Sequence, residues 1–293
     1  MDYILHILIL IGIFATLAIS LDLLVGHTGL LPLTQAAFYG LGAYTSALIA
    51  VRSGNHFFLG VLMGMAVASL ASLVVSFPSR RLHDDYFIIA TVGFQMIAFS
   101  IFKNWAVTNG SLGISGIQQP VILGLAIRSH VGFLLLSVVL ASFAYLVERL
   151  ISSSPFGRVL HAIREDEVFT QSLGKNTLTF KLTAFAVSAA LAAAAGSLYA
   201  HYITYIDPTS FTILESILVI SMVIIGGAGS RWGPIIGAAL LVILPEAIRF
   251  LGLPSSFAAN LRQIIYGALL VVMMMVRPQG IVGQYGFGRR KNG

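Results

Sequence analysis

Three acidic residues, Asp22, Glu215 and Glu246, stand inside long apolar runs of the chain. A charge inside a lipid bilayer is costly, and such residues commonly mark substrate paths, ion paths or proton relays. Each of the three stands near the end of its run, where water or a helix-end group can satisfy it. Glu246 follows Pro245 and precedes Arg249 by about one turn, which favours a structural role. Asp22 and Glu215 are therefore the stronger candidates for moving a polar solute or an ion.

Motifs for catalysis are nearly absent. The chain has no G-x-x-x-x-G-K-[ST] phosphate loop and no H-E-x-x-H zinc motif. It also has no cysteine, which excludes disulfides, thiolate metal ligands and a cysteine nucleophile. We expect no catalytic residues, no metal and no cofactor in this chain.

One short pattern is compatible with an enzyme. Gly113-Ile114-Ser115-Gly116 has the G-x-S-G form of rhomboid-type intramembrane serine proteases, with His201 as a conceivable base. The pattern is only four residues long, and Ser115 stands in a loop instead of opening a membrane-spanning helix. We therefore do not expect a protease.

The longest polar interruption, residues 155–181, has helix signals at both ends. Ser154 can cap a helix that has Pro155 at its first position, and Gly174 can end that helix. The predicted helix is amphipathic, with an apolar face made by Phe156, Val159, Leu160 and Ile163. Such a helix could lie on lipid, pack on its own bundle or insert into a partner. The acidic run at 165–167 favours a protein partner over lipid.

Composition defines the elements that must position these residues. The chain of 293 residues is 57% hydrophobic and 10% charged, with a mean hydropathy of +0.92. A span needs about 20 apolar residues, so the length supplies about eight to ten spans and no second, soluble domain. We predict an all-α integral membrane protein, one domain over 1–293, with a retained first span and about nine spans (range 8–10). Their approximate bounds are 4–25, 30–51, 57–78, 86–102, 130–150, 182–203, 211–226, 233–251 and 261–277.

The distribution of Lys and Arg predicts an orientation. Cytoplasmic loops carry an excess of these residues, and placing the N-terminus outside and the C-terminus inside puts 12 of the 17 basic residues in the cytoplasm. The formal net charge of +6 then reflects membrane insertion and does not imply nucleic acid. Residues 152–181 become a cytoplasmic loop. Residues 103–129 become an extracytoplasmic loop that either dips into the pathway or lies on the surface.

Several longer stretches resemble one family of transport proteins. The chain is similar to LivM-type permease subunits of branched-chain amino acid ABC importers, in the LivH/LivM permease family. The resemblance covers most of the chain, and its strongest part begins at Gly157. The similar stretches are residues 21–48, 84–94, 108–117, 157–200, 207–246 and 277–281.

The resemblance implies a set of partners in the cytoplasmic membrane of a bacterium or archaeon. They are a LivH-like second permease, two ATP-binding subunits that use ATP and Mg²⁺, and an extracytoplasmic binding protein. It also places a coupling helix for the ATPases in the cytoplasmic loop, at Arg164, Glu165, Asp166 and Gly174. The candidates for the substrate pathway combine polarity with a place in the similar stretches: Asp22, Gln35, Asn109, Ser115 and Glu215.

The chain departs from the family pattern at three places. Asp22 stands where relatives usually have Asn, residues 32–38 replace a usual Ser-Leu-Gly-His-Ala-Ala-Phe, and Asn109 stands where Gly is common. These departures leave the substrate open among branched-chain amino acids, other amino acids, urea and short amides. Asp22 and Glu215 also leave open a transporter of another class, which is driven by protons or cations.

Overall fold

The computed structural model describes residues 2–54, 56–77, 84–122, 125–127, 129–249, 255–277 and 279–283, and most of them are helical. Each predicted apolar run coincides with one helix of at least 14 residues. These helices are α1 (Asp2–Thr28), α2 (Gln35–Ser53), α3 (Phe57–Ser76), α4 (Asp84–Asn104), α5 (His130–Ser153), α8 (Thr177–Ile203), α9 (Ile213–Gly226), α10 (Gly233–Arg249) and α11 (Ser255–Val276). The predicted ends at residue 78 and residues 250–251 lie outside the described residues. Two short helices, α6 (Pro155–Glu165) and α7 (Glu167–Ser172), connect α5 to α8.

Helices α1 and α8 form the centre of the bundle, where α1 packs on α5, α8 and α10 while α8 packs on α2 and α3. Small residues let these helices approach closely, as is common in membranes. A Cβ atom on Gly42 would overlap the carbonyl of Ala193, and one on Gly196 would overlap the carbonyl of Tyr39. The Ala-rich run of α8 is buried for the same reason. The glycines thus serve the packing of α2 against α8.

The helices differ in their capacity to cross a bilayer. Within the described residues, five are long and apolar enough to do so: α1, α3, α4, α5 and α8. Helix α9 has 14 residues, which is about 21 Å at 1.5 Å per residue and less than a hydrocarbon core of about 30 Å. Apolar helices, several of them long enough to span, are the architecture expected of a multi-pass membrane protein.

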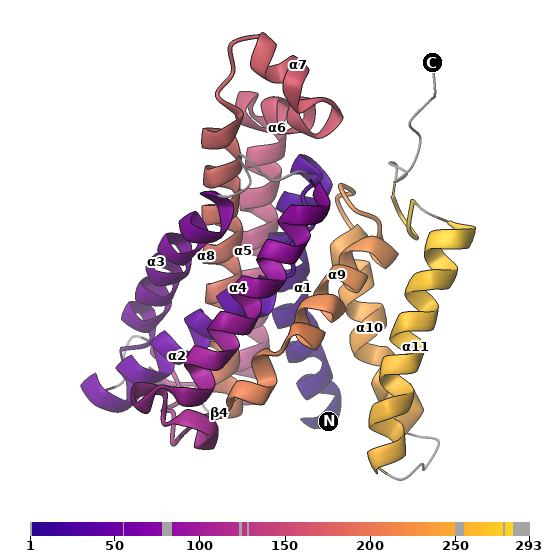
Figure 1. The fold of residues 1–293 in the computed structure, drawn as a ribbon. Coiled ribbons are helices and arrows are strands. Elements are labelled where there is room, and N and C mark those ends of the chain that lie inside the picture. The colour runs from indigo at the N-terminus through magenta and orange to yellow at the C-terminus, as the bar shows by residue number, and fades with distance from the viewer. Residues whose placement is uncertain are drawn as a thin grey trace.

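The α6–α7 segment, residues 155–174, projects at the end of the bundle opposite the start of α1 (Figure 1). Ser154 Oγ accepts the backbone N–H of Gly157 at 3.2 Å, and Pro155 opens α6, as the sequence predicts. The single helix expected up to Gly174 is wrong. Asp166 has extended backbone, ends α6 and caps α7 by accepting the N–H of Phe169 at 2.8 Å. An Asp side chain favours this cap, and the cap divides the segment into two helices.

The connection from α4 to α5 contains two short 3₁₀ helices, η2 (Ala106–Thr108) and η3 (Gly110–Leu112). It also holds three short strands, β1 (Ile114–Ser115), β2 (Val121–Ile122) and β3 (Leu125–Ala126), of which β2 pairs with β3. Strand β1 pairs antiparallel with β4 (Tyr205–Ile206), which follows α8. The 3₁₀ helix η4 (Pro208–Phe211) follows β4. This connection is therefore fixed at the end of the bundle away from α6 and α7 (Figure 1).

Candidate functional site

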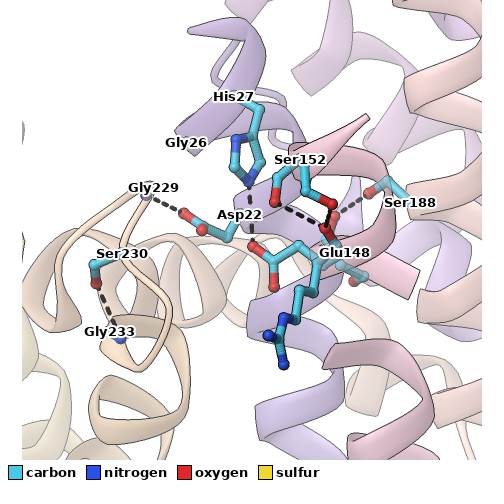
Figure 2. Close-up of polar contacts among 12 residues, drawn as sticks. Asp22, Gly26, His27, Glu148, Ser152, Ser188, Gly229, Ser230 and Gly233 are labelled. Carbon is cyan, nitrogen blue, oxygen red and sulfur yellow. Dashed lines mark hydrogen bonds and ion pairs between the residues drawn. The ribbon is translucent and has the colours of Figure 1, made fainter. Parts of the chain in front are cut away.

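A buried polar cluster joins α1 to α5 near the α6–α7 segment. Figure 2 shows Asp22 and His27 from α1 facing Glu148 from α5. His27 Nε2 lies 3.4 Å from Glu148 Oε1, and one ligand atom from each of the three residues lies within 4.8 Å of the others. Asp22 is fully buried, and Glu148 is 7% exposed. Two carboxylates and an imidazole thus share a space that solvent barely reaches.

Helix α6 closes this cluster from the side of the projecting segment. His161 Nε2 lies 3.1 Å from His27 Nδ1, and Arg164 donates a hydrogen bond to the carbonyl of Gly26. Burial lowers the pKa of His161, and the neighbouring His27 and Arg164 lower it further. Leu160 and Ile163 of α6 are buried on the side of the helix that faces the bundle. The apolar face and Arg164 together anchor α6 on the last turn of α1.

The turn between α9 and α10 contacts the same end of α1. Asp22 Oδ1 accepts the backbone N–H of Gly229 at 2.8 Å (Figure 2). A Cβ on Gly26 would lie 2.5 Å from the Gly229 nitrogen, so the close approach requires glycine. Asp22 and Gly26 therefore link α9 and α10 to α1, and Arg164 links α1 to α6.

A cavity of about 420 Å³ opens beside the cluster. Its wall includes His27 and Glu148 of the cluster and the neighbouring His161. It also includes two guanidinium groups, those of Arg149 and Arg231. Arg149 and Arg231 are exposed, whereas His27 and Glu148 are buried. The cavity gives a polar solute or ion a route to the cluster.

Helix α7 carries the exposed part of the segment. Glu167 accepts hydrogen bonds from Lys181 Nζ at 2.6 Å and from Thr177 Oγ1 at 2.9 Å, which ties α7 to the start of α8. Three apolar side chains nevertheless face solvent, each more than 60% exposed: Val168, Phe169 and Leu173. Glu165 and Asp166 are exposed beside them. Gly174 is exposed and has a φ of 77°, which suits the turn into α8.

The five predicted pathway residues do not meet in one place. Gln35 is buried and donates to Ser20 Oγ at 2.5 Å, while its Oε1 has no hydrogen-bond partner within the described part of the chain. Asn109 and Ser115 are exposed in the connection from α4 to α5. Asn109 there adopts the left-handed conformation and donates to the Gly113 carbonyl at 2.9 Å. Asp22 belongs to the cluster near α6, and Glu215 lies in the first turn of α9.

Glu215 faces a second cavity of about 590 Å³ between α1, α9, α10 and α11. The wall is mostly aliphatic, with Leu10, Leu218 and Leu270 among its residues. Glu246 lines the same cavity and accepts a hydrogen bond from Tyr3. A half-buried carboxylate in an apolar groove can bind a cationic group of a solute whose remainder is apolar.

The Ser115 and His201 pair has no structural support as a catalytic dyad. His201 is buried, and its Nδ1 and Nε2 atoms contact the Gln118 carbonyl at 2.6 Å and Ser46 Oγ at 2.9 Å. Ser115 is exposed in strand β1. Both ring nitrogens of the conceivable base are thus occupied by groups other than Ser115.

Three residues of this region, Glu148, His27 and His161, are not among the candidates that the sequence predicts. Glu148 lies inside the predicted span 130–150, so the criterion that singled out Asp22 could have found it as well. The two histidines have no such signal, because a lone histidine near a span end is most often structural. The meeting of positions 22, 27, 148 and 161 arises only from the packing of α1, α5 and α6.

Comparison with known proteins agrees with this architecture. The family described as branched-chain amino acid transport system / permease component matches residues 3–274. The high-affinity branched-chain amino acid transport system permease protein LivM of Salmonella typhimurium is 35% identical over 92% of this chain and 68% of its own length. A probable LivM of Methanocaldococcus jannaschii is 27% identical over 90% of this chain and 84% of its own. The autoinducer 2 import system permease protein LsrC of Yersinia pseudotuberculosis is 26% identical over 85% of this chain and 69% of its own length.

No solved structure shows a significant match to the chain. The family match covers nearly all of the bundle described above, from the first turn of α1 to the last turn of α11. The chain therefore belongs to the branched-chain amino acid transport system / permease component family.

Proposed function

We propose that this chain is the permease subunit of an ATP-driven importer for branched-chain or related amino acids. The observation that carries the proposal is the α6–α7 segment, which is anchored on α1 by Arg164 and exposes Phe169 and Leu173. An exposed apolar patch beside acidic groups is typical of a protein interface. The names of the LivM relatives support the substrate class.

In this proposal the chain crosses the inner membrane about nine times, with its N-terminus outside and its C-terminus in the cytoplasm. Helix α9, which is shorter than the hydrocarbon core, crosses inside the bundle. The positive-inside distribution of Lys and Arg supports the orientation. At the α6–α7 end, Arg158, Lys175 and Arg231 are among the described basic residues, while Lys103 marks the opposite end. A LivH-like permease, two ATP-binding subunits and an extracytoplasmic binding protein complete the transporter.

The segment transmits ATP binding to the bundle. Arg164, Glu165, Asp166 and Gly174 form the contact with the ATPase, and exposed Phe169 inserts into it. Movement of α6 reaches α1 through the Gly26 carbonyl, and reaches α9 and α10 through Asp22 and Gly229. Alternating access then follows from a shift between two arrangements of these helices, driven by their different contacts with the ATPase.

For the substrate pathway, Glu215 is the strongest of the five candidates, because it lines a mostly apolar cavity of about 590 Å³. Its carboxylate suits the ammonium group of an amino acid, and the aliphatic wall suits a branched side chain. Asn109 and Ser115 suit the entrance, where the binding protein docks. Asp22 and Gln35 hold the helices that move. Loss of uptake in Glu215→Ala with assembly intact is expected; unchanged uptake in all five single Ala variants would remove the whole set.

The experiment that tests the function is uptake of labelled leucine into proteoliposomes that contain the complete transporter and enclosed ATP. We expect uptake that requires ATP and the binding protein and that persists with an uncoupler. Uptake that collapses with the uncoupler and persists without ATP would identify an ion-coupled transporter instead. The LsrC relative makes another polar solute the second candidate substrate. The absence of labelled leucine uptake, together with ATP-dependent uptake of labelled urea, a short amide or autoinducer 2, would support that alternative.

A further inference from the structure

The cluster of Asp22, His27 and Glu148 has an unmet electrostatic requirement. Asp22 is fully buried, and while its Oδ1 accepts the Gly229 N–H, its Oδ2 has no hydrogen-bond partner in the described part of the chain. Glu148 is 7% exposed and directs a second carboxylate into the same space. Two adjacent buried carboxylates are unstable without a proton or a cation between them. The cluster therefore requires either a proton shared by Asp22 and Glu148 or a bound cation.

The donor atoms match a divalent transition metal. We propose that Asp22, His27 and Glu148 bind one Zn²⁺-type ion at the junction of α1 and α5. The two carboxylates balance the charge of the cation, and the imidazole favours zinc over magnesium or calcium. Tetrahedral zinc ligands at about 2.1 Å from the metal lie about 3.4 Å from one another. The three ligand atoms lie within 4.8 Å, so small side-chain rotations bring them to these distances.

His161 acts as a positioning residue for this ion. Its Nε2 lies 3.1 Å from His27 Nδ1. In the metal-bound tautomer, His27 donates its Nδ1–H to His161 and presents the lone pair of Nε2 toward Glu148, which lies 3.4 Å away. Metal-binding histidines regularly make such a second hydrogen bond, which fixes the orientation of the ring. Three helices, α1, α5 and α6, thereby contribute to one centre.

The cavity of about 420 Å³ supplies the remaining requirements. Its wall includes His27, Glu148 and His161, so an ion can enter from the α6–α7 end and keep a water as its fourth ligand. No linear zinc motif reveals the centre, since its ligands come from positions 22, 27 and 148. A bound ion would hold the segment with His161 against α1.

The test is equilibrium dialysis of the metal-stripped, full-length chain in lipid nanodiscs against Zn²⁺, with the bound metal counted by mass spectrometry. We expect one tightly bound equivalent in the wild type. Asp22→Asn keeps an acceptor for Gly229 and should weaken binding at least 100-fold, as should His27→Gln. His161→Gln should weaken it about 10- to 100-fold. The matched control is His130→Gln, an exposed histidine at the other end of α5, which should bind like the wild type.

Two results would overturn the proposal. A wild-type chain without a tight equivalent would mean that a shared proton holds the carboxylates. If both Asp22→Asn and His27→Gln still bound one tight equivalent of Zn²⁺, the ion would lie on other side chains. Cobalt substitution guards against a variant that fails to fold, because the wild-type absorption spectrum should itself report a tetrahedral site of nitrogen and oxygen ligands. An octahedral, water-like spectrum would contradict the proposed site.

Discussion

Lys181 shows how single residues hold the projecting segment in place. Its side chain is buried, and its Nζ atom lies 2.6 Å from Glu167, which is about one third exposed. Breaking a buried ion pair by removing one partner leaves the other charge uncompensated. The partial exposure of Glu167 reduces that cost. The pair therefore stabilises the attachment of α7 to α8.

At the residue scale we predict that Glu167→Gln lowers the free energy of unfolding by about 1 to 3 kcal/mol, because Lys181 loses its counter-ion. Thermal unfolding in nanodiscs measures this effect. The matched control is the double variant Glu167→Gln with Lys181→Met, which removes both charges and should recover most of the loss. Equal stability of the wild type and Glu167→Gln would mean that the Lys181 ammonium group is solvated well enough without its counter-ion.

At the element scale, α6 and α7 work as two helices with separate tasks. Helix α6 buries Leu160 and Ile163 and contacts α1 through Arg164. Helix α7 begins at the Asp166 cap and exposes Phe169 and its neighbours. Amphipathic spacing predicts the start and the buried face of α6, because both depend on local residues. The break at Asp166 depends on one cap competing with helix continuation, and the sequence pattern does not resolve that competition.

The turn at Gly174 gives a prediction for this element. Its φ of 77° lies outside the range of proline, and its N–H donates to Gln171 at 2.9 Å. Gly174→Pro should therefore displace α7 and abolish coupled uptake, while the permease still inserts in the membrane. The control is Gly174→Asn, since Asn tolerates the left-handed conformation and should retain most uptake. Wild-type uptake by Gly174→Pro would show that α7 needs no fixed position.

In the whole molecule, the apolar runs predict where each long helix lies, because a chain segment in lipid must be apolar and must satisfy its backbone hydrogen bonds as a helix. The same runs cannot give the meeting of Asp22, Glu148 and Gly229, which requires α1, α5 and the α9–α10 turn to pack together. They also cannot separate Glu215, which lines a cavity, from Gln35, which contacts Ser20. Both are polar residues in apolar surroundings. Packing, not local pattern, distinguishes them.

The proposed topology can be measured directly, because the chain contains no cysteine. Lys175→Cys near α7 and Lys103→Cys at the far end of α4 are both exposed positions. A membrane-impermeant maleimide should label Lys175→Cys only in inside-out vesicles and Lys103→Cys only in right-side-out vesicles. The reverse pattern would invert the orientation, and labelling of both positions from one side would contradict the crossing of the membrane by α5 between them.

The proposed coupling of an ATPase to the bundle by the α6–α7 segment can be measured with the variant Glu165→Arg. Glu165 is exposed and lies between Arg164 and the Asp166 cap, so charge reversal should disturb the docking surface and leave the fold intact. ATP hydrolysis and leucine uptake are measured together in proteoliposomes, with Lys103→Glu at the opposite end as the control. We predict that Glu165→Arg hydrolyses ATP at the wild-type rate but takes up leucine at least tenfold more slowly. Lys103→Glu should keep both rates. Wild-type uptake by Glu165→Arg would show that this surface of the segment does not couple the ATPase to the bundle.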